Sequence, residues 1–279
     1  MQATLPQEMQ QHTYAIMDEV EGSHWWFVGR RAILESFLHT IIAKLGSPPY
    51  EGGVDAASGG RGGSPAGDGP AEAGTTNPRI LDVGCGTGAN LEMLSQYGEA
   101  VGVDVSDDAL EFCRKKGLKV QKGLAETLPY DDETFDLTTA LDVVEHLDDD
   151  VAGLKEMHRV TKRGGYSLVF VPAFMWLWGV QDDISNHRIR YTKSQIVERL
   201  QRAGYEIERA TYANFTFFAP ILGGRVFMKL TGIKPASENN INVSALNGVF
   251  GRLFAAERFL LSKLNFPFGV SIVVVARKR

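Results

Sequence analysis

The segment 80–89 combines residue types that suit the binding of a nucleoside-containing cofactor. A short apolar strand pattern runs directly into glycines at positions 84, 86 and 88, and a helical pattern follows at 90–94. Glycine lets the backbone turn sharply and approach a ligand, and the first turn of a helix offers free N–H groups and the positive end of its dipole. The spacing also fits the dinucleotide pattern Gly-x-Gly-x-x-Gly/Ala, so the glycines alone do not identify the cofactor.

A carboxylate follows at the end of the next expected strand. Asp104 lies about 20 residues after the first of these glycines, which is where nucleotide-binding folds place an acidic residue beside the ribose. One carboxylate can accept hydrogen bonds from two vicinal hydroxyls. Asp104 therefore predicts a ribose-containing cofactor, but it does not distinguish a dinucleotide from another nucleoside.

Titratable side chains also follow the fourth expected strand. Asp142, Glu145 and His146 have the i, i+3 and i+4 spacing that places side chains on one face of a helical turn. His146 is a candidate for catalysis or substrate contact. We predict no metal, with Asp142, Glu145 and His146 as the weak candidates should one bind. The alternative is that the three form only structural hydrogen bonds.

The segment 172–192, after the fifth expected strand, mixes aromatic and ionisable residues. Loops beyond the carboxyl ends of parallel strands form the active-site crevice of such folds. His187 is our first candidate for a general base, with Asp183 and Tyr191 as partners that orient the acceptor. In the alternative interpretation, His187, Arg188 and Arg190 form a salt-bridged hinge of a lid and have no chemical role.

Alternating strand and helix patterns surround these residues. Such alternation predicts an α/β fold with a parallel sheet and right-handed crossovers. Thr192 and Gln195 have the spacing of a capping box, which predicts a helix start there. The expected strands are 79–83, 100–105, 119–122, 135–141, 166–171, 205–212 and 270–277, and the expected helices between the early strands are 89–97, 107–116 and 149–160.

Composition divides the chain into three predicted parts. Residues 1–45 read as a helical cap with a break at Gly22, and residues 46–78 as a flexible glycine-rich linker that has almost no large apolar side chains to bury. Residues 79–279 would form the catalytic domain, with a helical insertion at 213–268. In the cap, Trp25, Trp26 and Arg30 could contact a substrate, or the aromatics could simply pin the helices to the body.

Bulk composition narrows the class of protein. The chain has 279 residues, is 44% hydrophobic and 23% charged, and carries a net charge of −5, so we expect a globular protein without a nucleic-acid partner. Two cysteines do not suggest a disulfide framework or a zinc site. Neither a signal peptide nor a membrane span is apparent, and we therefore expect a cytoplasmic protein.

The ordered motifs resemble class I S-adenosylmethionine-dependent methyltransferases, in particular the group that includes ubiquinone and menaquinone methyltransferases. The resemblance covers residues 79–172. It rests on Leu81-Asp-Val-Gly-Cys-Gly-Thr-Gly88, Gly102-Val-Asp-Val-Ser106, Gly123-Leu-Ala-Glu126 through Phe135-Asp136, Asp142-Val-Val-Glu-His146, and Lys155-Glu156 through Gly164-Gly165. As an ordered set these motifs are far more specific than the glycines alone.

The resemblance implies a Rossmann-like, doubly wound, seven-stranded and mostly parallel sheet, with S-adenosylmethionine as cofactor and S-adenosylhomocysteine as product. Asp82 and the glycine turn would face the methionine part, Asp104 the ribose, and residues 124–126 the adenine. The implied cofactor-binding residues are Asp82, Gly84, Cys85, Gly86, Gly88, Asp104, Val105, Leu124, Ala125, Glu126 and Leu141. Trp176 and Trp178 join Trp25, Trp26 and Arg30 as candidates for substrate binding.

We therefore predict methyl transfer to a small-molecule acceptor, most simply an oxygen nucleophile that is lipid-like or aromatic. The alternatives are an NAD(P)-dependent oxidoreductase, a non-catalytic subunit that binds the cofactor, and an RNA methyltransferase, which the acidic net charge disfavours. The insertion 213–268 has more apolar residues than a thin lid needs. It could pack on the body, contact a membrane or lipid, or form a homodimer interface.

Overall fold

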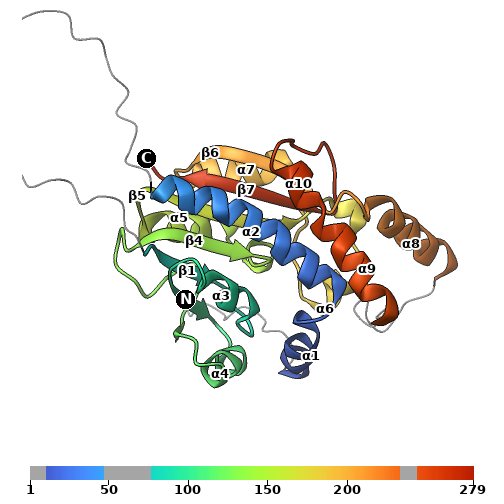
Figure 1. Cartoon of the computed structure of the whole chain (residues 1–279), viewed down its shortest axis with the longest axis horizontal. Coiled ribbons are helices and arrows are strands. Elements are labelled where there is room, and N and C mark those ends of the chain that lie inside the picture. Colours follow the sequence, from blue (N-terminus) through green and yellow to red (C-terminus); the bar gives the residue numbers. More distant parts are fainter. Residues whose placement is uncertain (1–10, 47–76, 233–243) are drawn as a thin grey trace, which may run out of the picture.

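The computed structural model describes residues 11–46, 77–232 and 244–279, and its centre is a seven-stranded sheet (Figure 1). The strand order is β3-β2-β1-β4-β5-β7-β6, in which β1 to β5 are parallel and β7 runs antiparallel to both of its neighbours. The predicted α/β fold with a mostly parallel seven-stranded sheet is confirmed. The strands are β1 (Arg79–Val83), β2 (Glu99–Asp104), β3 (Val120–Lys122), β4 (Phe135–Leu141), β5 (Thr161–Pro172), β6 (Glu206–Ala213) and β7 (Ser271–Arg277).

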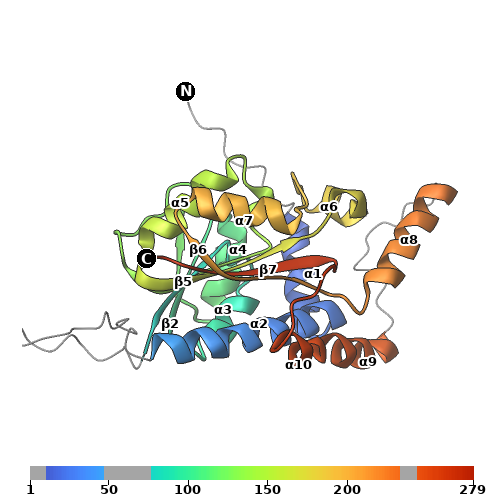
Figure 2. The ribbon, with the colours of Figure 1, turned by 90° about the horizontal axis from the view of Figure 1, so that it is seen from above.

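The central strands are buried along most of their length because helices cover both faces of the sheet. Every residue of β4 is buried, as is every residue of β7 except Arg277. Figure 2 shows α5 and α7 on one face and α2 and α3 on the other. A strand that is buried on both faces has no need of alternating polar residues.

The helices follow the predicted pattern with shifted ends. The helix expected at 89–97 ends at Leu94, and the strand expected at 166–171 begins at Thr161, which pairs with Phe135 ahead of a register shift. The helices are α1 (Gln11–Glu21), α2 (Trp25–Leu45), α3 (Ala89–Leu94), α4 (Asp107–Lys115), α5 (Asp150–Val160), α6 (Val180–Ile184), α7 (Lys193–Arg202), α8 (Phe218–Thr231), α9 (Ser244–Ala255) and α10 (Glu257–Leu261), with short 3₁₀ turns at Val144–His146 and Met175–Leu177.

The second N-terminal helix belongs to the core of the domain. In α2, Ile33, Leu34, Phe37, Leu38 and Ile41 are buried at helical spacing, and they join the cluster that includes the strand residues. The predicted helix break near Gly22 is confirmed, since α1 ends at Glu21 and α2 begins at Trp25. The predicted linker at 46–78 lies almost wholly outside the described residues, and the domain boundaries remain predictions.

The helix expected after the loop 173–191, called the acceptor loop, begins where its capping signal predicts. Thr192 caps α7 by accepting a hydrogen bond from the backbone N–H of Gln195 at 3.3 Å, and the Gln195 side chain accepts from the backbone N–H of Thr192 at 2.8 Å. This reciprocal pair fixes where the loop ends and α7 starts. The residues just before Thr192 are therefore held in place relative to the start of α7.

The insertion at 213–268 supplies α8, α9 and α10. Figures 1 and 2 place α8 and α9 together at one end of the molecule, with α10 beside α9. The arrowheads of the central parallel strands point toward this end in Figure 1. Among the described residues, no helix has both the length and the apolar character needed to cross a bilayer.

Candidate functional site

The glycine turn lies between β1 and α3 and has the backbone conformation that its sequence requires. Gly84, Gly86 and Gly88 have φ values of +68°, +53° and +93°, which side chains strongly disfavour. A Cβ on Gly84 would lie 2.5 Å from Val143, whereas a Cβ on Gly86 would meet no described heavy atom within 4 Å. Gly84 is thus needed for packing, and Gly86 presents bare backbone to open space where a ligand can approach.

Cys85 contributes only its backbone to this turn. Its side chain is buried beneath the turn, so close to β2 that a Cβ on Gly102 would lie 2.6 Å from the Cys85 Sγ. Cys113 donates from Sγ to the Gly86 carbonyl at 3.2 Å. The hydrogen bond with Cys113, followed by burial, raises the pKa of the Cys85 thiol. A neutral, buried thiol supports the turn and does not face a cofactor.

Asp104, at the end of β2, is tied to the same turn. One carboxylate oxygen accepts from the backbone N–H of Gly86 at 2.9 Å, and the other accepts from that of Ser106 at 2.9 Å. A carboxylate oxygen can accept more than one hydrogen bond. The two bonds hold the carboxylate at the edge of the turn, which is the position that ribose hydroxyls would need.

Asp82, in β1, is buried beside the turn. One of its carboxylate oxygens accepts from Thr139 Oγ1 at 2.7 Å, and the other has no hydrogen-bond partner among the described residues. Burial raises the pKa of Asp82 to about 7, although Thr139 and Arg30 both act to lower it. A buried carboxylate oxygen without a partner is costly, and a cationic ligand group would satisfy it.

The N-terminal helices cover the glycine turn. Glu21, at the end of α1, accepts a hydrogen bond from Thr87 of the turn. Arg30 is buried in α2, donates to Asn90 at 3.2 Å, and forms an ion pair with Asp142 at 2.8 Å. These contacts place Arg30 beside the cofactor turn, and its role in substrate binding stays a prediction.

The remaining predicted cofactor residues lie at the same edge of the sheet. Val105 follows β2, the half-buried segment 124–126 follows β3, and Leu141 ends β4. Because β3, β2, β1 and β4 are neighbours in that order, the ends of these strands form one continuous rim. Glu126 has a raised pKa, chiefly because it is half-buried.

This rim fits the cofactor that the resemblance implies. The unpartnered Asp82 oxygen suits an ammonium group, and the buried Nε of Arg30, which also has no hydrogen-bond partner among the described residues, suits a carboxylate. The methionine part of S-adenosylmethionine carries both groups. Asp82, Arg30, the backbone at Gly86, and Asp104 would therefore hold this cofactor.

On the acceptor side, His187 is oriented by Asp182. The Nδ1 atom of His187 lies 2.8 Å from Oδ1 of Asp182, and the same oxygen accepts from Arg190 at 2.7 Å. The other carboxylate oxygen, Oδ2, accepts from Arg225 at 3.2 Å. Burial would raise the pKa of Asp182, but His187 and Arg190 together hold it at about 2. Asp182 is therefore a permanent carboxylate that holds the His187 ring in one orientation.

Asp183 and Tyr191, which were predicted to orient the acceptor, have other hydrogen-bond partners in the structure. Asp183 accepts from the indole N–H of Trp178 at 2.9 Å and does not contact His187. Tyr191 is fully buried and donates to Asp150 at 2.9 Å, so its hydroxyl cannot orient an acceptor. The α6 helix places Asp182, and not the adjacent Asp183, on the side facing His187. The sequence alone could not decide between two neighbouring aspartates.

The ion pairs of the alternative hinge interpretation are also present. Arg190 is bound to Asp182, and Arg188 forms an ion pair with Asp148 at 2.9 Å and donates to the backbone carbonyl of His146. They hold the loop 173–191 in place. This structural role and a chemical role for His187 are compatible, because Asp182 is bound at Nδ1, while Nε2 lies 4.0 Å from the Glu145 carboxylate, beyond hydrogen-bond distance.

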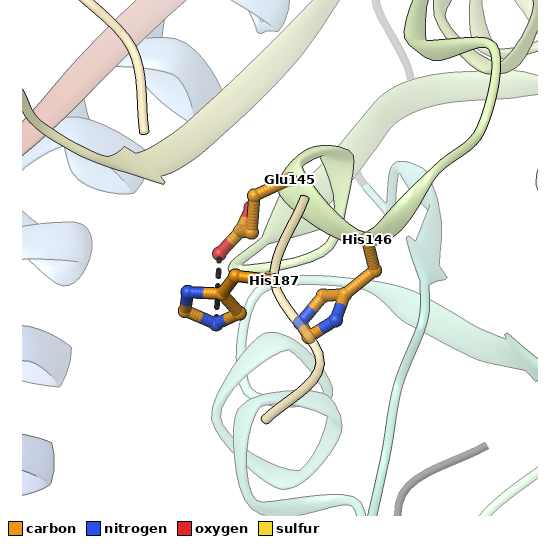
Figure 3. Close-up of side chains that lie close together, drawn as sticks. All are labelled: Glu145, His146 and His187. Carbon is orange, nitrogen blue, oxygen red and sulfur yellow. Dashed lines mark ion pairs between the residues drawn. The ribbon is translucent and has the colours of Figure 1, made fainter. Parts of the chain in front are cut away.

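Glu145 and His146 both lie beside the His187 ring, so the three side chains form one cluster (Figure 3). The Glu145 carboxylate points toward His187, with Oε1 4.0 Å from Nε2, and the two imidazole rings lie 4.7 Å apart. Their ligand atoms all lie within 4.8 Å of one another, so the three could hold a divalent cation.

The expected set of Asp142, Glu145 and His146 is wrong as a cluster. The chain forms only a short 3₁₀ turn at Val144–His146, and Asp142 turns away to pair with Arg30. Burial, and then the charge of Asp142, raises the pKa of Glu145 well above its usual range. Burial lowers the pKa of His146 to about 3. Both side chains therefore favour their neutral forms.

The predicted substrate-binding tryptophans are spread over two places. Trp25 lies against the insertion, with its ring 4.6 Å from Phe217 and 6.0 Å from Phe254, while Trp26 lies next to Arg30. Trp176 is about half exposed on the loop after β5 and stacks on Phe174. Trp25 and Trp26 thus link the N-terminal helices to neighbouring elements, and Trp176 is the tryptophan that remains open to a ligand.

Comparison with known proteins agrees with this site. Residues 81–169 match the family model of a methyltransferase domain. A demethylmenaquinone methyltransferase of Chlorobaculum tepidum is 35% identical over 103 residues, which are 36% of this chain and 43% of that protein. An uncharacterized methyltransferase of Schizosaccharomyces pombe is 43% identical over 104 residues, 32% of this chain and 37% of that protein. The matches thus span only about two fifths of these relatives.

Among solved structures, a methyltransferase of Thermotoga maritima shares the fold. It is described as S-adenosylmethionine-dependent and as a possible histamine N-methyltransferase, and the superposition covers 95% of this chain and 97% of that one, with a TM-score of 0.52 and 20% identity. Identity at this level speaks for the fold alone. Together with the glycine turn, Asp104 and the domain match, these findings show that the chain carries a class I S-adenosylmethionine-dependent methyltransferase domain.

Proposed function

We propose that the chain transfers the methyl group of S-adenosylmethionine to a hydroxyl oxygen of a small-molecule acceptor. The observation that carries this proposal is the pair of His187 and Asp182 on the loop after β5. Nδ1 of His187 is held by Asp182, so Nε2 is the nitrogen left to accept a proton. A hydroxyl becomes a good nucleophile only when a base removes its proton. A neutral amine or a thiolate already has a reactive lone pair and does not need a base in this position.

The cofactor supplies an electrophilic methyl group on a sulfonium. In the proposed reaction the acceptor's oxygen would bond to the methyl carbon as the methyl–sulfur bond breaks. The sulfur would keep that electron pair, so S-adenosylhomocysteine would be the leaving group, and the proton of the acceptor's O–H would go to Nε2 of His187. The carboxylate of Asp182 stabilises the imidazolium that forms, and Arg190 and Arg225 keep Asp182 ionised. The rim and the loop would hold cofactor and acceptor in line, which is the main requirement of such a displacement.

A bound cation is the competing use of the same atoms. A metal at Glu145, His146 and His187 would occupy Nε2 of His187, so metal binding and proton acceptance at this atom exclude each other. We favour the base because Asp182 already orients the His187 ring, and because burial raises the pKa of Glu145, which disfavours the carboxylate form that a cation would need. Turnover is accordingly expected to be unchanged after treatment with a chelator.

The acceptor is proposed to be aromatic or lipid-like. Phe174, on the loop after β5, stacks on Trp176 and Tyr212 with ring centroids 5.0 and 5.1 Å apart, and Phe218 of α8 meets the edges of Phe174 and Trp176. Such a cluster suits a flat, apolar ligand. The relative from Chlorobaculum tepidum, by its name, methylates a demethylmenaquinone, which belongs to this chemical class.

The test uses S-adenosylmethionine with a tritiated methyl group and an organic extract of cells as the source of acceptor. Label should enter a product that mass spectrometry shows to be an O-methyl compound. His187→Ala should lower the rate by roughly 100-fold to 10,000-fold, because a positioned base is lost. Its affinity for S-adenosylhomocysteine should not change.

His158→Ala is the matched control. His158 packs on Tyr205 at the opposite end of α5 from the loop, so its loss should leave the rate nearly unchanged. Equal rates for His187→Ala and the wild type would remove His187 from the mechanism. Absence of any labelled product, with cofactor binding intact, would favour the non-catalytic subunit instead.

A further inference from the structure

We propose that α8, α9 and α10 form a surface that binds an anionic lipid bilayer at its interface. This surface, the lid face, consists of the exposed side chains of these three helices and of the loop 262–264 that follows α10. The inference goes beyond methyl transfer itself, since it concerns where the protein resides when it acts. It rests on four features of the described residues: exposure, charge, position and continuity with the acceptor loop.

The lid face exposes large apolar side chains. Leu230 is 82% exposed, and Phe227, Val249, Leu253, Phe259 and Leu260 are each between 48% and 63% exposed. In α8 only Arg225 is buried, although the helix is apolar in most of its residues. A helix of this composition normally covers a core, so its exposure indicates an interaction with something outside the described structure.

Charge on the lid face identifies the partner. Among the described residues of 214–268, every exposed charged side chain is positive, namely Lys229, Arg252, Arg258 and Lys263, and the single acidic residue, Glu257, is buried. The chain as a whole carries a net charge of −5. A positive, apolar surface on an acidic protein matches the anionic headgroups and acyl chains of a bilayer.

The position of the lid face suits a lipid-like acceptor. Figures 1 and 2 show α8 and α9 at the end of the molecule toward which the parallel strands point, and α6, which precedes His187 in the chain, lies at the same end. Phe218, in the first turn of α8, meets Trp176 of the acceptor loop at 5.8 Å between ring centroids. An acceptor held in a bilayer would reach the site along this aromatic contact without crossing water.

The fold secures the lid face to the domain. A Cβ on Gly29 of α2 would lie 2.4 Å from Phe254, so α9 approaches α2 as closely as glycine allows. Arg225 anchors α8 through Asp182, and the buried Glu257 of α10 accepts from the backbone N–H of Thr216 at 2.7 Å. The face that remains outward is therefore the one bearing the apolar and basic residues.

Sedimentation with vesicles tests the proposal. The full chain, with S-adenosylhomocysteine present, is mixed with vesicles of phosphatidylcholine alone or with 30% phosphatidylglycerol added, roughly the anionic fraction at which basic residues act. The wild type should sediment with the anionic vesicles and much less with the neutral ones. The double variant Leu230→Glu/Phe259→Glu should lower the partition coefficient by at least about tenfold, because two apolar contacts become negative charges.

A second double variant separates the contribution of charge to vesicle binding from that of apolar contact. Arg252→Gln/Lys263→Gln should weaken binding to the anionic vesicles by roughly fivefold for each charge removed, with little effect on neutral vesicles. Ile16→Glu is the matched control, since Ile16 is an exposed apolar residue of α1, 45% exposed, and α1 is not part of the lid face. It should bind like the wild type. Calorimetry with S-adenosylhomocysteine verifies that every variant is folded.

Two results would overturn the proposal. The first is a wild type that does not sediment with anionic vesicles. The second is a dimer in sedimentation velocity that becomes a monomer in Leu230→Glu/Phe259→Glu, which would make the lid face a contact between two copies. Either result leaves the methyltransferase proposal standing, because methyl transfer to the organic extract and cofactor affinity are measured without vesicles.

Discussion

The cofactor turn and the acceptor loop hold their functional groups in different ways. In the turn 84–88, backbone atoms do most of the work: Gly84 donates to the Val103 carbonyl at 2.7 Å, and Gly86 donates to Asp104 at 2.9 Å. In the loop 173–191, ionised side chains hold one another around Asp182. The turn depends on backbone conformations that favour glycine, and the loop depends on a network of ionised side chains.

This difference predicts how each region fails. A backbone-built turn tolerates changes in its surroundings but not a changed glycine or the loss of the carboxylate that it binds. A network of buried charges loses much more when one member is removed, because the partners stay behind without a counter-charge. Substitutions in the two regions should therefore separate cofactor affinity from stability.

The largest effect is expected at the centre of the charge network. Asp182→Asn would leave the buried guanidinium group of Arg190 without the carboxylate that it pairs with and would remove an ion pair of Arg225, and should lower the free energy of unfolding by about 3–5 kcal/mol. Urea unfolding followed by fluorescence measures this change. Asp183→Asn is the matched control and should cost less than about 1 kcal/mol. Equal losses in the two variants would refute the assignment of Asp182.

The next effect belongs to the cofactor turn. Asp104→Ala should weaken S-adenosylhomocysteine binding by roughly 100-fold, because two charge-assisted hydrogen bonds to ribose hydroxyls are worth about 1.5–3 kcal/mol each and part of this is regained by water. Calorimetry gives the affinity. Asp107→Ala, in the first turn of α4, removes an exposed ion pair with Lys122 and should leave affinity within twofold. A similar loss in both variants would contradict the proposed ribose contact.

A smaller effect concerns pH. The pKa of Asp82 is raised to about 7, and the cationic ammonium of the cofactor should prefer its ionised form. Affinity for S-adenosylhomocysteine should therefore rise with pH up to about 7 and level off above it, falling by up to tenfold for each pH unit below. Calorimetry between pH 5.5 and 8.5, values chosen to bracket that pKa, records the profile. Asp82→Asn should flatten it, and an unchanged slope in that variant would assign the titration to another group.

The backbone-built region was the more predictable of the two from sequence. The glycine spacing, the apolar run before it and Asp104 act within 25 residues of one another, so their pattern indicated the turn, the strand and the cofactor edge together. The fold was likewise predictable, because strands buried on both faces and capping boxes are local signals. Helix ends were missed by a few residues, as for α3, whose last turn gives way to the bends before Gly98.

The charge network could not be predicted in the same way. Asp182 and Asp183 are adjacent and of one type, and only the start of α6 at Val180 decides which of them faces His187. Arg225 reaches Asp182 across 43 residues, and Glu21 reaches Thr87 across 66. No spacing rule links residues so far apart. One local signal could have favoured Asp182. It is the third residue of α6, and an acidic residue in that position can accept a hydrogen bond from the backbone N–H just before the helix, as Asp182 does from Gly179.

S-adenosylmethionine is proposed to bind across the turn 84–88 and beneath the N-terminal helices. Hydrogen exchange followed by mass spectrometry tests it directly, with S-adenosylhomocysteine and NAD added separately to the full chain. S-adenosylhomocysteine should slow exchange at 82–90, at 102–106 and in α1 and α2 near Glu21 and Arg30, with NAD producing no change. Protection by NAD alone, or protection by S-adenosylhomocysteine that spares 82–90, would contradict it.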